Sequence, residues 1–429
     1  MLRVVASLGA LLLGMGTMLL GNGLFGTLTA LRMSIESFSP ASIGVVVACH
    51  SIGFAAACLT CQRIIQAVGH IRVFAAFAAI LAVCCLCFPV AVDPFAWMAL
   101  RLLFGYSAAA VFMVGESWLA GAAPSDMKGK VFAVYMVINK GCFGTGQLLL
   151  ILGDPAGDRL FMLVASLYAI CLIPIALART KGPEGLGAER LSLRELYQLS
   201  PVGVAGAITA GATNSSLLGL GPVFARGHGL SVTEVSIFMA VFLAGSLLLQ
   251  IPIGRTSDRF DRRSVLIGVV LLAAGACVAM AVIPANGLVQ VLTLSALVGG
   301  LSATTYPIAM THANDLAKPE QTVSLHAGLL FSFAIGASIG PVIASLAMQQ
   351  MGPGGLFAFA AVAYVMLAAF TLYRMTRRSP MPELKQTDFV AMPQTSLTTP
   401  NVAALDPRTD GADEPAEDGA PGAKQTPPN

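Results

Sequence analysis

Three side chains with strong chemistry lie inside long apolar stretches of this sequence: His50, Arg101 and Lys140. The stretches that carry Arg101 and Lys140 follow one another and turn near Ala123, so a helical hairpin would place the two cations within about one turn of the same depth. No carboxylate falls at that depth. A buried charge without a partner is costly and marks a functional site. The pair predicts an electropositive patch for an anionic or amphipathic molecule, unless Arg101 extends along the apolar surface towards water.

A second group of candidates is mostly neutral. They lie near the middle or the end of other apolar stretches, namely Asn22, Asn214, Ser215, Tyr306 and Glu116. The neutral members could hold a small molecule through hydrogen bonds, or they could bond neighbouring helices to one another at about 0.6 kcal/mol each. For Glu116, which lies near the end of its stretch, the simpler interpretation is an ion pair with Lys128 or Lys130.

Signatures of catalysis and metal binding are missing from the sequence. There is no phosphate-binding loop and no nucleophile–base–acid set. Cys58 and Cys61 form a C-x-x-C pair, but a zinc site would need a second ligand pair at a fixed spacing. The nine cysteines all fall in apolar stretches, where they behave as small buried hydrophobic residues. We therefore expect no enzyme, no cofactor, no metal and no nucleic-acid partner.

The composition excludes a water-soluble globular protein. Of the 429 residues, 56% are hydrophobic and 11% are charged, whereas soluble domains carry about 25% charged residues. A helix needs about 20 residues to cross a bilayer, and apolar windows of this length define twelve spans. The spans are Val4–Leu31, Ala41–Cys61, Ile71–Val92, Phe95–Gly121, Val131–Leu152, Leu160–Ala178, Val202–Phe224, Val232–Ile253, Ser264–Pro284, Leu288–Asn314, Val323–Met348 and Gly355–Met375. The first is too long for the apolar core of a signal peptide, so we expect it to be retained.

Lysine and arginine are distributed unevenly between the loops. With the N-terminus in the cytoplasm, seventeen of the 25 lie in cytoplasmic loops or adjoining helix ends. Three lie on the outer side, namely Arg32, Arg159 and Arg226. Cytoplasmic loops of membrane proteins carry such an excess of positive charge. The sequence thus predicts a multi-pass protein of the bacterial inner membrane, surrounded by the lipid bilayer, with both termini cytoplasmic.

The two halves of the chain repeat one another. Three pairs of residues at corresponding places are each separated by 192 positions: Asn22 and Asn214, Gly69 and Asp261, and Gly144 and Gly336. One offset at three places argues for duplication, as in transporters whose halves are related by an axis along the membrane normal. We expect an N-terminal six-helix bundle at residues 1–179, a cytoplasmic central loop at 180–200, a C-terminal six-helix bundle at 201–376 and a tail at 377–429.

The tail differs in composition from the rest of the chain. Ser379–Asn429 is rich in Pro, Thr, Ala and Gly, and carries eight acidic residues against three basic ones. Such a segment cannot bury enough apolar surface to fold. We expect a disordered cytoplasmic tail, which either stays solvated or recruits a partner.

Between the eighth and ninth spans the chain reads GRTSDRFDRR, and the length of the flanking spans leaves room only for a tight loop of ten residues. Its four arginines outnumber its two aspartates and mark the cytoplasmic side. The pattern G-x-x-x-D-R-x-x-R-R resembles the loop signature of the major facilitator superfamily, found there between helices 2 and 3 or 8 and 9. The resemblance implies that Asp258 faces the start of the fifth span. It implies a conformational latch formed by Gly254, Asp258, Arg259, Arg262 and Arg263.

The corresponding loop of the first half departs from this signature. When Gly69 is aligned with the glycine of the motif, Gln66 stands where an aspartate is expected and His70 where an arginine is. A carboxylate near a helix N-terminus gains roughly 0.3–1 kcal/mol from the helix dipole. We expect the uncharged Gln66 to hold its side of the protein more loosely.

Further motifs extend the resemblance to the whole chain before the tail. Arg101-Leu-Leu-Phe-Gly105-Tyr-Ser-Ala-Ala is similar to the helix-4 motif of the superfamily, with Phe104 at a usually polar position, and this links Arg101 to proton coupling. Span eleven carries Gly336-Ala-Ser-Ile-Gly340-Pro341, which resembles an antiporter pattern normally found in helix 5, so the direction of transport stays open. Three short stretches resemble the YcaD-like branch of the superfamily: Glu116-Ser-Trp118-Leu119, Tyr135-Met136 and Gly146-Gln147.

Taken with the spans, the resemblance implies an all-α polytopic membrane protein with twelve transmembrane helices in two pseudo-symmetric six-helix bundles. We expect a monomeric secondary transporter that moves a small solute by alternating access, with protons as the candidate coupling ion. The alternative is a non-transporting membrane scaffold or sensor that recruits a partner through its acidic tail.

Overall fold

A computed structural model of the chain describes residues 8–124, 127–176, 193–282, 287–318, 321–377, 389 and 398–405. The start of the expected first span, most of the central loop and most of the tail lie outside the described residues. Within the described ranges the regular structure is helical, and no strand occurs.

Within the same ranges, twelve helices of 18 to 30 residues occupy the places of the twelve expected spans. They are α2 (Gly9–Ile35), α3 (Pro40–Val68), α4 (His70–Cys87), α5 (Pro94–Ala122), α6 (Lys128–Leu148), α7 (Arg159–Ala176), α9 (Pro201–Gly227), α10 (Val232–Arg259), α11 (Arg262–Val282), α12 (Leu288–Asn314), α13 (Thr322–Met351) and α14 (Gly355–Met375). Ten of the described helices are long and apolar enough to cross a membrane by length and composition alone. The other two are α7, whose apolar part is shorter, and α9, whose polar run from Thr213 to Ser216 lowers its hydropathy. The expected twelve-helix fold is confirmed.

Polar capping residues begin several of these helices. The Ser39 hydroxyl accepts a hydrogen bond from the backbone N–H of Ser42 before α3, and the Asp93 carboxylate caps α5 in the same way. A proline follows each cap, where its missing N–H costs nothing. Ser231 and Glu234 form a capping box at the start of α10. Ser39 and Ser231 are separated by 192 residues and cap corresponding helices, which supports the internal repeat.

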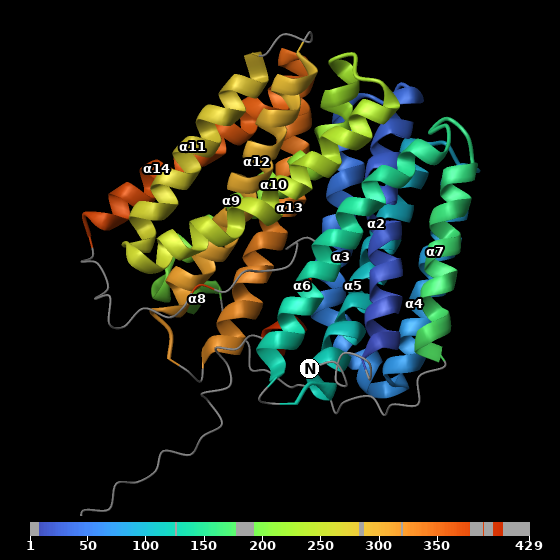
Figure 1. The fold of residues 1–429 in the computed structure, drawn as a ribbon, viewed down its shortest axis with the longest axis horizontal. Helices are drawn as coiled ribbons and strands as arrows, with labels where there is room; N and C mark the ends of the chain where they lie inside the picture. Colours follow the sequence, from blue (N-terminus) through green and yellow to red (C-terminus); the bar gives the residue numbers. More distant parts are fainter. Residues whose placement is uncertain are drawn as a thin grey trace, which may run out of the picture.

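The helices form two bundles, α2–α7 and α9–α14, which stand side by side in Figure 1. Glycines let helices cross closely at corresponding places in both. A Cβ atom at Gly53 of α3 would overlap the carbonyl group of Leu102 on α5, and one at Gly245 of α10 would overlap that of Ala296 on α12. Gly53 and Gly245 are again separated by 192 residues. Close crossings through small residues are typical of membrane helices, and their repetition follows the pseudo-symmetry of the fold.

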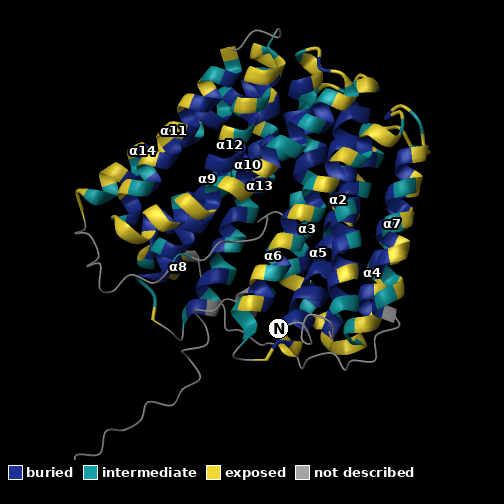
Figure 2. Ribbon diagram, in the orientation of Figure 1, coloured by how far each residue is buried: buried dark blue, intermediate teal, exposed yellow. Residues whose placement is uncertain are grey.

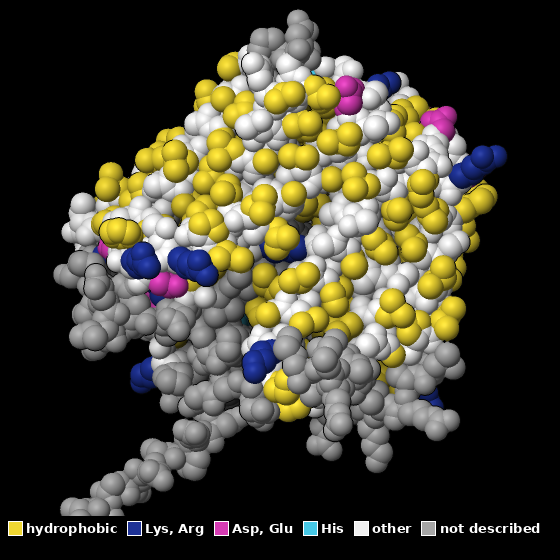
Figure 3. All heavy atoms as spheres, viewed as in Figure 1, with side chains coloured by type: hydrophobic (Ala, Val, Ile, Leu, Met, Phe, Trp, Pro, Cys, Tyr) yellow, Lys and Arg dark blue, Asp and Glu magenta, His cyan; other side chains and the backbone are white. Residues whose placement is uncertain are grey.

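Large apolar side chains face outwards from both bundles. Figure 2 shows that burial is concentrated between the helices, and Figure 3 shows hydrophobic side chains spread over the flank of the molecule. Leu248 and Val289, for example, are 71% and 76% exposed. Soluble proteins rarely expose contiguous apolar surface on this scale, whereas lipid covers it without cost. The chain is a multi-pass membrane protein.

The basic connection between α10 and α11 is shorter than the sequence predicts. The helix α10 continues to Arg259 and α11 begins at Arg262, so two residues connect them. The prediction of a ten-residue loop is wrong because Gly254–Arg259 continue α10 beyond its apolar part. An ion pair between Asp258 and Arg262, with its atoms 3.2 Å apart, bridges the turn. We call the end of the bundles that carries this connection and the α3–α4 connection the basic face, and the opposite end the far face.

Two segments outside the twelve long helices also pack against the bundles. In the central loop, α8 (Leu193–Leu199) buries Leu196 against Gly328 of α13. In the tail, Thr398 and Thr399 are buried and are followed by a 3₁₀ helix, η6 (Pro400–Leu405). The sequence alone predicts disorder throughout the tail, and the segment 398–405 departs from that prediction.

Candidate functional site

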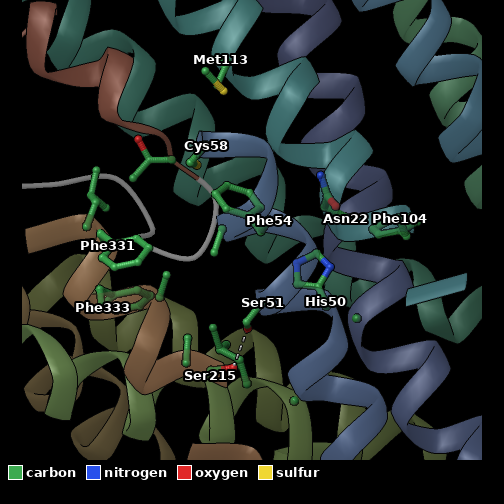
Figure 4. A pocket seen from close by; sticks show the side chains of 18 of the residues that line it. Asn22, His50, Ser51, Phe54, Cys58, Phe104, Met113, Ser215, Phe331 and Phe333 are labelled. Carbon is green, nitrogen blue, oxygen red and sulfur yellow. Dashed lines mark hydrogen bonds between the residues drawn. The ribbon is translucent and has the colours of Figure 1, made fainter. Parts of the chain in front are cut away.

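A cavity of about 470 Å³ lies between the two bundles. Helices α2, α3, α5 and α6 of the first bundle and α9, α10 and α13 of the second line it. Figure 4 shows side chains of both bundles around it, with Ser51 of α3 bonded to Ser215 of α9. Sites for small molecules usually measure about 300–1,000 Å³. The cavity therefore has room for a metabolite-sized solute.

Six phenylalanines in the described part of the chain contribute to the largely apolar walls of the cavity. The rings of Phe25 and Phe104 stack with their centroids 4.2 Å apart, and Phe54 lines the same bundle. Phe331 and Phe333 line the cavity from α13. Sequence reasoning missed most of these residues, because an aromatic side chain in a membrane helix can face lipid, core or cavity. The one signal was Phe104, which stands at a usually polar position of the helix-4 motif.

Arg101 lines the cavity from α5 and is 6% exposed. Its guanidinium donates a hydrogen bond to the Thr29 hydroxyl, and its Cζ atom lies 4.8 Å from the centroid of the Phe25 ring. This is a cation–π contact, which holds the planar group in place. Among the described residues, the buried Nε atom of Arg101 has no hydrogen-bond partner. Arg101 thus faces the cavity and does not extend towards the outer water interface.

Asn22 and His50 add two more unsatisfied polar atoms to the same cavity. Asn22 accepts a hydrogen bond from the Tyr168 hydroxyl at 3.0 Å through Oδ1, but in the described part of the chain its buried Nδ2 has no partner. The same holds for Nδ1 of His50, whose ring lies 5.9 Å from that of Phe104. Most buried polar atoms in proteins are hydrogen-bonded. Three of the exceptions among the described residues belong to side chains that line this one cavity.

The other neutral candidates divide between the cavity and the helix packing. Ser215 lines the cavity, and its hydroxyl oxygen lies 3.4 Å from that of Ser51 in the opposite bundle. Asn214 and Tyr306 are buried but lie outside the residues that line the cavity. Tyr306 packs edge-on against Phe333, with the ring centroids 5.5 Å apart. For these two residues the structure favours the role in bonding and packing helices.

Lys140 also lies outside the cavity lining. Its ammonium group donates a hydrogen bond to the side-chain oxygen of Gln250 on α10, so the contact joins the two bundles. Among the described lining residues, Arg101 carries the one full charge. The structure thus separates the two cations that the sequence places in one patch. The hairpin argument gives the depth of each residue but not the side of the helix on which it lies.

We expect replacement of Lys140 by methionine to lower the free energy of unfolding by about 1–3 kcal/mol, because it removes the charged donor from the buried amide of Gln250. The double variant Lys140→Met/Gln250→Leu should lose less than Lys140→Met alone, since replacing both partners by apolar groups leaves no unmatched polar atom. Denaturant unfolding of the purified protein in detergent measures both. Strictly additive losses in the double variant would contradict the contact.

Glu116 lies on α5 near the basic face of the protein and is completely buried. Its carboxyl group accepts hydrogen bonds from the Tyr135 hydroxyl at 3.0 Å, from the Thr398 hydroxyl at 2.7 Å and from both the backbone N–H and the hydroxyl of Thr399. These four donors occupy the carboxyl group in place of the lysine that the sequence suggests. Two of the three residues come from the tail, which is why no local pattern reveals them.

The latch residues form a network at the basic face. The Nε atom of Arg262 donates to Asp315 at 2.6 Å, and Arg263 pairs with Asp261, while Arg259 is exposed. Burial alone would raise the pKa of Asp261, but hydrogen bonds from Arg263 and its charge outweigh that effect and hold the pKa below its usual value.

Asp258 has a different partner from the one that the motif implies. Its Oδ1 accepts hydrogen bonds from Arg262 at 3.2 Å and from the backbone N–H of Phe389 in the tail at 2.8 Å. The Phe389 ring packs on Gly254, where a Cβ atom would overlap it. In this conformation the tail therefore occupies the carboxylate that is expected to face the start of α6.

Comparison with known proteins agrees with this architecture. The family model described as "Major Facilitator Superfamily" matches residues 202–405. The chain is 27% identical over 379 residues to the "Uncharacterized MFS-type transporter YcaD" of Salmonella typhi and to that of Escherichia coli (strain K12 / DH10B). The alignment covers 87% of this chain and 96% of each relative.

Solved structures show the same fold at lower identity. The nucleoside transporter NupG superposes with a TM-score of 0.71 at 16% identity, covering 86% of this chain and 99% of that one. A bacterial homolog of the human lysosomal transporter Spinster, in an inward-facing and occupied conformation, gives a TM-score of 0.71 at 15% identity, covering 90% and 98%. In its helices, its repeat and its sequence the chain is therefore similar to the major facilitator superfamily, and over most of its length to the YcaD-like transporters.

Proposed function

We propose that this transporter moves a small amphipathic solute with an anionic group across the bacterial inner membrane by alternating access. The observation that carries the proposal is the cavity between the bundles, in which unpartnered atoms of Asn22, His50 and Arg101 meet aromatic walls. Aromatic faces would cover the apolar body of the cargo, and the polar atoms would bind its charged end.

The preference for an anion rests on the charge of Arg101. The described residues that line the cavity include no aspartate or glutamate, so nothing in the lining balances the guanidinium. A planar guanidinium binds a carboxylate or phosphate through two parallel hydrogen bonds. Asn22 adds an N–H donor through its free Nδ2. An acceptor-rich, negatively charged group satisfies these donors better than a neutral or cationic one.

Alternating access is supported by where the bundles touch. At the far face, Gly44 of α3 packs so closely on Ser345 of α13 that a Cβ atom would overlap it, and Ser236 donates to the Gln147 carbonyl at 2.6 Å. The cavity lining reaches Gln62 of α3, near the basic face. The positive-inside rule makes the basic face cytoplasmic, so the site would be closed outwards and reached from inside.

The proposal is tested by a thermal-shift screen of the purified protein against anionic, neutral and cationic amphipathic metabolites, followed by uptake of the hits into proteoliposomes with an imposed pH gradient. We expect anionic compounds to stabilise the protein and Ser215→Phe, which fills the cavity, to abolish the shift. Ser166→Phe on the exposed face of α7 is the matched control and should retain it. Uptake that responds to the pH gradient would support proton coupling. Equal stabilisation by cationic and anionic compounds would refute the anion preference.

A further inference from the structure

The tail returns to the cavity between the bundles. Thr398, Pro400 and Asn401 belong to the residues that line it, and Thr399 and Val402 are buried beside them. We call residues 398–402 the tail segment. A chain segment that is this polar would normally stay in water, so the contacts it makes inside the protein require an explanation.

The first contacts of the tail segment are with α5 and α6 of the N-terminal bundle. Both threonines bind the carboxyl group of Glu116, as described above. The Asn401 amide donates to the Met113 carbonyl at 3.0 Å and to the Ser117 hydroxyl at 2.7 Å. The tail segment thus satisfies a fully buried carboxyl group that has no basic partner among the described residues.

The other contacts of the tail are with the C-terminal bundle. The 3₁₀ helix η6 packs against α13 as well as α5 and α6, so it lies between the two bundles. Earlier in the tail, the Phe389 backbone N–H binds Asp258 on α10, and its ring covers Gly254. The tail therefore contacts both bundles near the basic face, where they must come together when the transporter opens outwards.

We propose that the tail segment is an autoinhibitory plug, which occupies the transport cavity from the basic face and holds the bundles apart there. Closing the basic face requires that the tail segment leave Glu116 and that Phe389 release Asp258. Release of Asp258 frees the carboxylate that the latch motif would place at the start of α6. The proposal regulates the site described above and rests on its alternating access.

The test is a distance measurement without cargo. Spin labels attached through non-natural amino acids at Lys130 and Lys318, exposed residues at the basic ends of the two bundles, report how far apart these ends lie and leave the native cysteines unlabelled. We expect one long distance in the full chain. Deletion of residues 378–429 should raise the share of a shorter distance about tenfold or more, because the hydrogen bonds to Glu116 are lost. Deletion of 406–429, which keeps the tail segment, should leave the distribution unchanged.

Two further variants keep the proposal testable if the long deletion impairs folding. Thr398→Ala/Thr399→Ala in the full chain should populate the shorter distance, whereas Thr376→Ala, which changes an exposed threonine at the end of α14, should not. A synthetic peptide of residues 396–404 should restore the long distance to the shortened protein. The same peptide with alanine at both threonines should restore it only at a concentration at least about tenfold higher, because it lacks the threonine hydroxyl hydrogen bonds.

Identical distributions in the full chain and in the 378–429 deletion would overturn the plug, as would a shift caused by deleting 406–429 alone. Because neither measurement contains cargo, these outcomes are independent of the preference for anions. A plug that behaves as expected in a protein that binds no anionic compound would refute the proposed cargo and leave the regulation intact.

Discussion

Replacing Arg101 by leucine should lower the affinity for an anionic cargo about a hundredfold or more. The guanidinium is the one full charge among the described lining residues, and its cation–π contact with Phe25 orients it. Hydrogen bonds to charged groups contribute about 1.5–3 kcal/mol each, and a bidentate pair therefore corresponds to at least two factors of ten in affinity. Arg101→Lys keeps the charge but not the two parallel donors, and should retain an intermediate affinity.

Unlike the affinity for cargo, the stability of the cargo-free protein should not fall in Arg101→Leu. The Thr29 hydroxyl keeps its hydrogen bond to the Phe25 carbonyl when Arg101 is replaced, so no polar partner is left unmatched and leucine at position 101 should unfold no earlier than arginine. Arg32→Leu is the matched control, because Arg32 is also largely buried but lies at the far face, paired with Glu36. It should lower stability and leave cargo affinity unchanged. Titration calorimetry and thermal unfolding separate the two effects. If Arg32→Leu lost as much affinity as Arg101→Leu, the proposal that Arg101 binds the anionic group of the cargo would be contradicted.

The helices could be predicted from the sequence because a membrane span is a local property. About 20 apolar residues in a row must form a helix in lipid, since no water satisfies the backbone. The capping residues Ser39 and Ser231 mark helix starts for an equally local reason. The connection after α10 was harder to delimit, because the charged residues Arg255, Asp258 and Arg259 continue the helix beyond its apolar part.

The site could be predicted only in part, because it depends on contacts between distant residues. The sequence singles out Arg101, Asn22 and His50 because polar groups are rare at membrane depth, and all three line the cavity. Lys140 has the same depth but lies on the side of α6 that meets α10. Two of the three residues that donate to Glu116, Thr398 and Thr399, are more than 280 positions away in the chain. Composition predicts a tail that does not fold alone, but it carries no information about the carboxyl group that Thr398 and Thr399 bind.

Replacing Asp315 by asparagine should destabilise the protein by about 1.5–3 kcal/mol. The side chains of Arg262 and Asp315 are 1% and 2% exposed, and their Nε and Oδ2 atoms lie 2.6 Å apart. Removing the charge of Asp315 takes a charged acceptor from the buried Arg262 guanidinium, and Asp258, 3.2 Å away and partly exposed, compensates for the loss only in part. Asparagine has nearly the same size as aspartate, so the effect isolates the charge. We expect a much lower unfolding temperature in detergent and poor yield from the membrane.

Asp261→Asn provides the comparison at the same face. Its partner Arg263 lies 3.0 Å away, but the Asp261 side chain is 26% exposed, and water replaces most of what the ion pair contributes. We expect a loss of about 1 kcal/mol or less. The double variant Arg262→Met/Asp315→Leu should recover much of the stability lost in Asp315→Asn, because it removes both charges and keeps the packing. If Asp315→Asn and Asp261→Asn unfold at the same temperature, burial does not distinguish the two pairs. The start of α11 and the end of α12 would then be held together by contacts other than this ion pair.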